Sequence, residues 1–304
     1  MNIEENIKII KEAYSILKES YGLRSDTLDM QASYFKGLTK TDYKNLDDKS
    51  KAMRQDFIKI LTTINGINHL YSSYQKGEYQ SLYYDIIPYS DISNQLNCFI
   101  EYLFIKYSVI FEYIQGILEI CIPYKFNEEE KGEYNKLIKN NKKWEKFDFL
   151  LNYISTKLND EEKKLINIEW FKQIINNRNR IVHAGSTAVT YLNKDNLLFK
   201  VRDIDSINNE NDGEENSFFM DKKRCILYKY YWGLQISKLI IFSKNIFQFL
   251  LKEGKISKET KIIMEVTNIK EKGGVRTLGG DKLPDIQSSL EEMLKIVIVE
   301  LEHK

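Results

Sequence analysis

The sequence predicts a mainly α-helical protein: a multi-helix bundle with a small β-hairpin insertion and a mixed C-terminal appendage. Only 3 prolines and 14 glycines occur in 304 residues, which are too few turn-forming residues for an all-β fold. Hydrophobic residues make up 42% of the chain and recur at helical spacing over long stretches. We therefore expect packed amphipathic helices around a globular core.

The first helix is expected at residues 3–20, where apolar side chains fall on one face and Gly22 follows as a stop. A polar stretch over 21–45 then separates this helix from a second one at about 47–75. In the second helix, apolar residues again recur at steps of three and four, which is typical of a helix with one buried face.

The longest regular segment covers about residues 91–122, after an aromatic segment at 79–90 that is expected to be a loop. Its apolar residues keep a 3.6-residue period, and Pro123 is expected to end it. The charge-rich segment 128–146 follows. Its lysines beside Trp144 are interpreted as the solvated face of a helix.

A further helix is expected at about 161–184, and the pattern then changes to two β-rich runs around a short polar turn. These runs predict a hairpin at 187–201. The acidic, asparagine-rich run 203–216 is expected to be a loop or linker. A long apolar helix at about 217–252 would complete the helical domain.

The helical domain is assigned to residues 1–254 and a C-terminal appendage to 255–304. The appendage carries a possible strand at 261–266, the glycine-rich segment 273–282 and a terminal helix or strand at 290–301. The glycine-rich segment fails as a phosphate loop because Gly280 replaces the required lysine. The glycines suggest that the appendage adds little to the core. We expect its removal to affect regulation or partner binding more than folding.

Charge, cysteine content and the length of apolar runs argue against a strongly basic nucleic-acid-binding protein, a disulfide-linked protein and a membrane protein. The 45 basic and 44 acidic side chains nearly cancel, so any RNA contact must be a local basic patch. The cysteines at 98, 121 and 225 lie among apolar neighbours and are expected to pack as small hydrophobes in a reducing compartment. No metal site or cofactor is predicted. Without a signal-length or membrane-length apolar run, a cytoplasmic protein is expected.

The most informative motif is Arg178-Asn179-Arg180-Ile181-Val182-His183-Ala184-Gly185, at the end of the helix expected over 161–184. Histidine can take and give a proton near neutral pH. Arginine stays charged and binds phosphate with a planar fork of donors. This pair of side chains is what a ribonuclease that uses no metal requires.

The motif resembles the Arg-x(4 to 6)-His motif, with Asn directly after the Arg, of the HEPN superfamily of helical nucleotide-binding domains. The resemblance implies a metal-independent endoribonuclease in a prokaryotic defence or toxin system. It implies attack by the RNA 2′-hydroxyl on the adjacent phosphate, with Arg178 and His183 catalytic and Asn179 orienting the pair or contacting the substrate. It also implies a homodimer or higher homo-oligomer, and an antitoxin or defence-system protein as a partner.

The family often adds a polar or acidic residue from an earlier helix. A polar stripe follows the helix expected at 91–122, and from it Glu112 is the first choice to meet Arg178 or His183, with Glu101 and Glu119 as competitors. Arg180 and Lys172 are candidate RNA contacts, although both residues also fit a solvated surface.

Geometry leaves alternatives for the two central residues. Arg178 falls on the buried stripe of its helix, so it must meet a carboxylate, carbonyls or a phosphate-filled cleft, and a structural salt bridge is one such solution. His183 lies about 140° further around a straight helix. Either the helix distorts near Gly185, the pocket wraps around the helix end, or two copies share one cleft.

Two other functions stay open. The chain could be a non-catalytic HEPN module that binds RNA or nucleotide or serves as a dimeric adaptor, or a helical scaffold in which the motif is a coincidence. One branch of the family carries Tyr two places after the His as a target of modification. This chain has Gly185 there, which places control by that chemistry in doubt.

Overall fold

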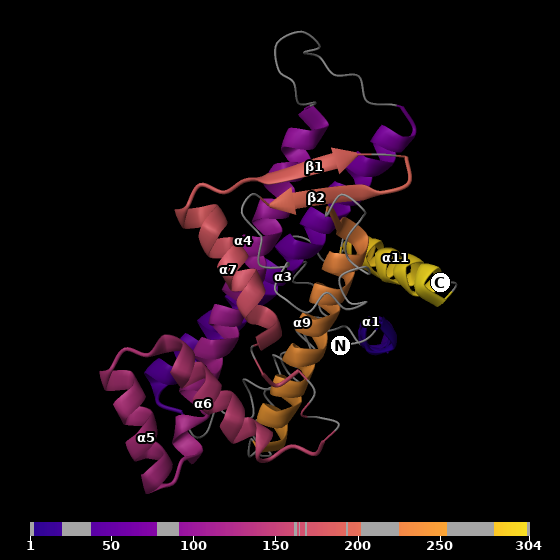
Figure 1. Ribbon diagram of the computed structural model, residues 1–304. Coiled ribbons are helices and arrows are strands. Elements are labelled where there is room, and N and C mark those ends of the chain that lie inside the picture. Colours follow the sequence, from indigo (N-terminus) through magenta and orange to yellow (C-terminus); the bar gives the residue numbers. More distant parts are fainter. Residues whose placement is uncertain are drawn as a thin grey trace, which may run out of the picture.

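The computed structural model describes residues 3–19, 38–77, 91–160, 163, 165–167, 169–192, 194–201, 225–253 and 283–302. These residues form a mainly helical molecule with one small antiparallel sheet (Figure 1). The helices are α1 (Ile3–Glu19), α3 (Lys40–Gln75), α4 (Asp91–Cys121), α5 (Glu128–Lys139), α6 (Lys143–Ser155), α7 (Glu169–His183), α9 (Tyr228–Glu253) and α11 (Leu283–Glu302), with a 3-10 turn η1 (Pro123–Lys125) after α4. The strands are β1 (Ala188–Leu192), β2 (Leu197–Val201) and β3 (Ile226–Leu227).

The long helices α3 and α4 run side by side through the molecule (Figure 1). α3 begins at Lys40 and not near residue 47 as predicted, because Thr39 caps it: the Thr39 hydroxyl accepts a hydrogen bond from the Asp42 amide at 3.1 Å. α4 has the predicted extent and ends just before Pro123. The hairpin lies near one end of this pair, and α5 and α6 lie near the other.

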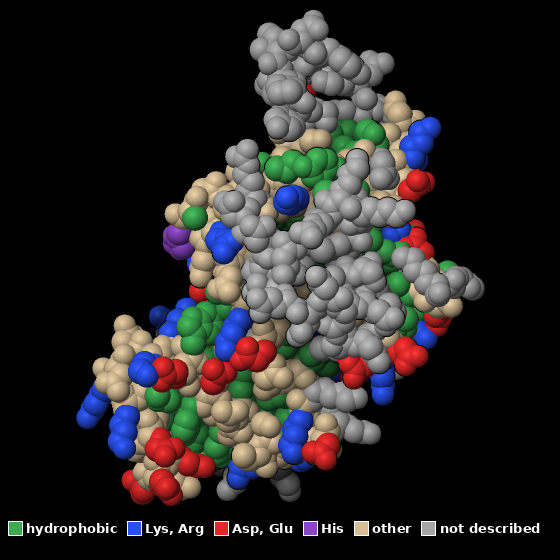
Figure 2. Space-filling view, viewed as in Figure 1, with side chains coloured by type: hydrophobic (Ala, Val, Ile, Leu, Met, Phe, Trp, Pro, Cys, Tyr) green, Lys and Arg blue, Asp and Glu red, His purple; other side chains and the backbone are tan. Residues whose placement is uncertain are grey.

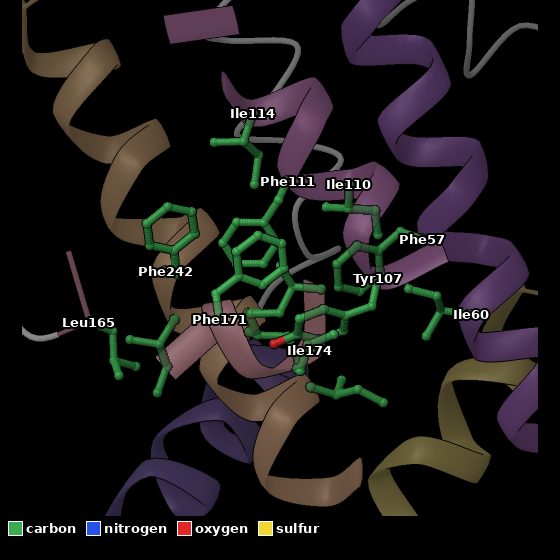
Figure 3. Close-up of a cluster of buried hydrophobic side chains, with 14 of the residues drawn as sticks. Phe57, Ile60, Tyr107, Ile110, Phe111, Ile114, Leu165, Phe171, Ile174 and Phe242 are labelled. Atoms are coloured by element: carbon green, nitrogen blue, oxygen red, sulfur yellow. The ribbon is translucent and has the colours of Figure 1, made fainter. Parts of the chain in front are cut away.

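An aromatic cluster joins α4, α7 and α9 in the core (Figure 3). The ring of Phe111 from α4 stacks on that of Phe171 from α7, with centroids 3.4 Å apart and an interplanar angle of 14°. Phe242 of α9 stacks on Phe111 from another direction, at 5.1 Å. Contacts between these rings add to the free energy that burial of the rings already supplies. The start of α7 is therefore held firmly against two other helices.

α9 is buried on almost every side, which is why its apolar pattern is not confined to one stripe. It is long and apolar enough to cross a membrane, but 78% of its most apolar window is buried inside the protein, as in the core helix of a folded domain. The helix begins at Tyr228, and residues 217–224 of the predicted helix lie outside the described residues. A cytoplasmic location stays a prediction.

The predicted hairpin is confirmed: β1 and β2 pair antiparallel, from Ala188 with Val201 to Leu192 with Leu197. The two-residue strand β3 pairs with β2 and takes the place of part of the helix predicted at 217–252. Side chains of α4 bind the outer edge of β1, where the Ala188 amide donates to Glu101 and the Thr190 amide donates to Asn97, both at 2.8 Å. These bonds fasten the hairpin that follows α7 to the central helix α4.

α7 begins at Glu169, eight residues later than predicted. Leu165 has a backbone φ of 64°, which a right-handed helix does not allow, and it lies in a non-helical segment. Its carbonyl accepts a hydrogen bond from the Trp170 indole at 3.3 Å, and its side chain is still buried. Leu165 is therefore buried without being part of a helix.

The expectation that the tail adds little to the core is wrong for α11. This helix packs against α1, α3 and α9, and Leu290, Leu294 and Val297 are fully buried within the main core cluster. The expectation was drawn from the glycines of segment 273–282. The helix α11, which is regular and amphipathic, follows that segment. The division into 1–254 and 255–304 stays a prediction, but loss of α11 is now expected to destabilise the fold.

Several predicted features lie outside the described residues. They are the loops at 79–90 and 203–216, the possible strand at 261–266 and the glycine-rich segment at 273–282.

Candidate functional site at the end of α7

The end of α7 is a regular helix terminus. Gly185 has φ of 66°, and the Arg180 carbonyl accepts hydrogen bonds from the amides of Ala184, at 3.0 Å, and Ser186, at 3.2 Å. This is a glycine-terminated helix cap, and its positive φ favours glycine at position 185. α7 is helical through His183 and leaves the helical conformation only at this cap.

A cavity of about 180 Å³ lies where α4, α6 and α7 meet. Arg178 and Asn179 of α7 border it, and so does Glu112 of α4. The structure thus brings together three of the four residues predicted as catalytic. The remaining lining residues are polar side chains and a set of aromatic and aliphatic ones: Ser108, Phe111, Gln115, Lys143, Trp144, Phe147, Phe171 and Ile175.

Arg178 is half-buried at the wall of this cavity. Its Nη1 donates to Asn179 Oδ1 at 2.9 Å, while its Nε is buried and has no hydrogen-bond partner. Among the residues that the structure describes, no carboxylate is paired with it. The structural salt bridge considered for Arg178 is therefore absent from the described part of the chain, and the guanidinium charge is left to a ligand or to water.

The three candidate carboxylates of α4 have different neighbours. Glu101 holds the edge of β1, and Glu119 accepts from Gln115 at 2.9 Å and pairs with Lys146 at 3.2 Å. Only Glu112 lines the cavity, where it pairs with Lys143 of α6 at 3.2 Å. Of the three carboxylates, Glu112 is the one placed to act beside Arg178.

His183 does not line the cavity. It is exposed in the last turn of α7, next to Val182, whose exposed fraction is 43%. Five helical residues turn the chain by about 140° beyond Arg178, so a straight helix directs the two side chains to different sides. Within one chain, the structure separates the proposed proton-transfer group from the proposed phosphate-binding group.

The two predicted RNA contacts also differ. Arg180 is exposed near the end of α7. Lys172 is bonded to Glu169 of its own helix, and this bond raises the pKa of the lysine above its ordinary value. Neither residue lines the cavity, so an RNA contact at either of them stays a prediction.

Sequence reasoning missed Lys143 and Trp144, which it interpreted as part of a solvated helical face. Trp144 is 38% exposed and forms a wall of the cavity, with its ring centroid 6.4 Å from that of the buried Phe171. The Lys143 Nζ lies 6.0 Å from the Trp144 ring centroid. A tryptophan directly after two lysines was the available signal, but its position against α7 depends on long-range packing.

The described residues contain no group of three or more His, Cys, Asp or Glu side chains that could hold a metal ion. Cys121 and Cys225 are buried and Cys98 is exposed, and none of them forms a disulfide. Burial raises the pKa of the Cys121 thiol well above its ordinary value, which makes it unreactive. The chain matches no family model, no curated protein and no solved structure.

Proposed function

We propose that this chain is a metal-independent endoribonuclease of the HEPN type, with its active centre at the end of α7. The setting of Arg178 carries the proposal. This guanidinium borders a cavity, is bonded to Asn179, and has no carboxylate partner among the described residues. An arginine so placed is available to a phosphate group, which it can bind with two parallel hydrogen bonds.

The proposed reaction needs the groups of the motif and solvent water. The RNA 2′-oxygen attacks the adjacent phosphorus, so the O2′–P bond forms and the P–O5′ bond breaks. His183 as a neutral imidazole takes the proton of the 2′-hydroxyl while water protonates the leaving 5′-oxygen, or His183 as an imidazolium protonates the 5′-oxygen while water takes the 2′-hydroxyl proton. Arg178 stabilises the negative charge that grows on the phosphate oxygens. The products carry a 2′,3′-cyclic phosphate and a 5′-hydroxyl.

The proposal includes a homodimer, because one chain does not place Arg178 and His183 in one cavity. Two copies that pack the ends of α7 together would bring the His183 of one chain toward the Arg178 of the other. The exposed side chain of Val182 supplies an apolar contact for such an interface. A role in a defence or toxin system, with an antitoxin or another defence protein as partner, rests on the family resemblance alone.

A second candidate is a non-catalytic module that binds RNA or nucleotide, or a dimeric adaptor. The position of His183 outside the cavity favours this candidate, since binding requires Arg178 and its neighbours but no proton transfer. The two functions differ in one result, the fate of the RNA.

Purified protein should cleave single-stranded or tRNA-like RNA in the presence of EDTA and leave cyclic phosphate ends. The Arg178→Ala and His183→Ala proteins should each lose at least about a hundredfold in rate, because each removes a group that stabilises the transition state or transfers a proton. Gel analysis of end-labelled RNA measures both the rate and the product ends.

His69→Ala is the matched control, because His69 is also an exposed histidine on a helix, α3, and does not border the cavity. It should cleave like the wild type. If the wild type binds RNA and leaves it intact, the binding module is the correct function. If the His183→Ala protein cleaves at the wild-type rate, His183 has no part in the mechanism.

A further inference from the structure

The cavity at Arg178 has walls suited to a flat aromatic ligand. Phe111, Phe147 and Phe171 are buried around it, whereas Trp144 is 38% exposed and presents part of its indole at the edge. A partly exposed tryptophan backed by a buried phenylalanine is a stacking surface that is already in place. Nucleic-acid bases stack on such rings whatever their sequence.

The polar side chains of the cavity have hydrogen-bonding capacity left. Gln115 donates its Nε2 to Glu119 Oε1 at 2.9 Å and to the Lys143 carbonyl at 3.4 Å, which leaves its Oε1 as an acceptor. Asn179 uses its Oδ1 on Arg178, which leaves its Nδ2 as a donor. Amides are the side chains that commonly bind the edges of bases.

The charges of the cavity favour an anion. Arg178 and Lys143 contribute two positive charges and Glu112 one negative charge, so the lining carries a net charge of +1. Charges of both signs intermix over α5 and α6 on the face shown in Figure 2. With a net charge of only +1 for the whole chain, attraction to a phosphate must come from such a local group.

We infer that the cavity binds one unpaired base of single-stranded RNA, stacked on Trp144, with a neighbouring phosphate on Arg178 and Lys143. This inference rests on the proposed function, and it adds how the substrate is recognised, as an unpaired base, and the residues that bind it. A base inside a duplex cannot reach the cavity without leaving its stack, so single strands bind more tightly than duplexes. Trp144 and Lys143 are binding residues in this account and take no part in proton transfer.

The test measures binding of a labelled single-stranded oligoribonucleotide in EDTA, in the His183→Ala background so that RNA stays intact. Trp144→Ala should weaken binding about tenfold, because one base–aromatic stack is lost, while Trp144→Phe should stay within about threefold. Tyr124→Ala is the matched control, since Tyr124 is a 67% exposed aromatic residue outside the cavity. It should leave the affinity unchanged.

Three results would overturn the inference: equal affinity of the Trp144→Ala and Trp144→Phe proteins, equal weakening by Trp144→Ala and Tyr124→Ala, or equal binding of a duplex of the same sequence. Thermal unfolding of each variant shows whether it is folded. The outcome is separable from that of the proposed function. Binding that depends on Trp144 without cleavage by the wild type supports the base-binding cavity and refutes the nuclease.

Discussion

The two ends of α7 differ in what surrounds them. At its start, Phe171 and Ile174 are fully buried, and Phe171 stacks on Phe111 of α4 (Figure 3). At its end, the side chains from Asn179 to His183 are mostly exposed, and Arg178 borders a cavity without a carboxylate partner. One half of the helix is held by packing, so the other half can present polar groups at fixed positions.

The largest effect on stability is expected at the packed end. Phe171→Ala should lower the free energy of unfolding by about 4 kcal/mol, because it removes a buried ring from the aromatic cluster and leaves a cavity. Urea denaturation measures the loss, and Phe171→Leu should cost less because it fills more of the space. A loss below about 1 kcal/mol for Phe171→Ala would show that the start of α7 is not held by packing.

A gain in stability is expected from replacing a buried lysine of α9 that lies close to the start of α7. Lys238 of α9 is 8% exposed, its Nζ lies 6.0 Å from the Trp170 ring centroid, and burial lowers its pKa to about 8. Because the folded state disfavours the charged amine, its cost to stability is fully present below pH 8. The cost falls as the pH rises toward 10.5, the ordinary pKa that the unfolded chain retains.

Lys238→Met should therefore raise the free energy of unfolding at pH 7 by about 2 kcal/mol. The difference between variant and wild type should shrink as the pH rises from 8 to 10, and chemical denaturation at several pH values measures it. A variant that is less stable than the wild type at pH 7 would mean that the charged lysine is stabilised in the core.

A smaller effect is expected at the exposed end. Gly185→Ala should lower the free energy of unfolding by about 1 kcal/mol, because residue 185 has a positive φ that alanine adopts at a cost. No atom lies within 4 Å of an added Cβ, so the cost comes from the backbone alone. Gly132→Ala is the control, since Gly132 lies within α5 and its added Cβ also meets no atom; it should not destabilise the protein.

Local pattern was sufficient to predict most of the helices and the hairpin. α4 keeps one period over its whole length, and β1 and β2 flank a short polar turn, so the local sequence is enough to predict these elements. The start of α7 was not predictable, because Leu165 is buried in a conformation that only tertiary packing supports. The burial of α11 likewise depends on helices far away in the sequence.

The candidate site was predictable in part for the same reason. Arg178 and Asn179 are adjacent in the sequence, and Glu112 was chosen from the polar stripe of a single helix. Lys143 meets Glu112 across 31 positions, and Trp144 meets Phe171 through the fold, so no local spacing could connect them. His183 lies outside the cavity because α7 stays helical as far as His183. The sequence left open whether the helix distorts there, the pocket wraps around the helix end, or two copies share one cleft.

One measurement tests the proposed chemistry most directly. An RNA oligonucleotide that the wild type cleaves at a mapped position is compared, in EDTA, with the same oligonucleotide carrying a single 2′-deoxy nucleotide on the 5′ side of that position. The account predicts that the modified strand stays intact there, because the attacking 2′-oxygen is missing, while the parent strand yields a 2′,3′-cyclic phosphate. Cleavage of both strands at equal rates would contradict it, since the nucleophile would then be water.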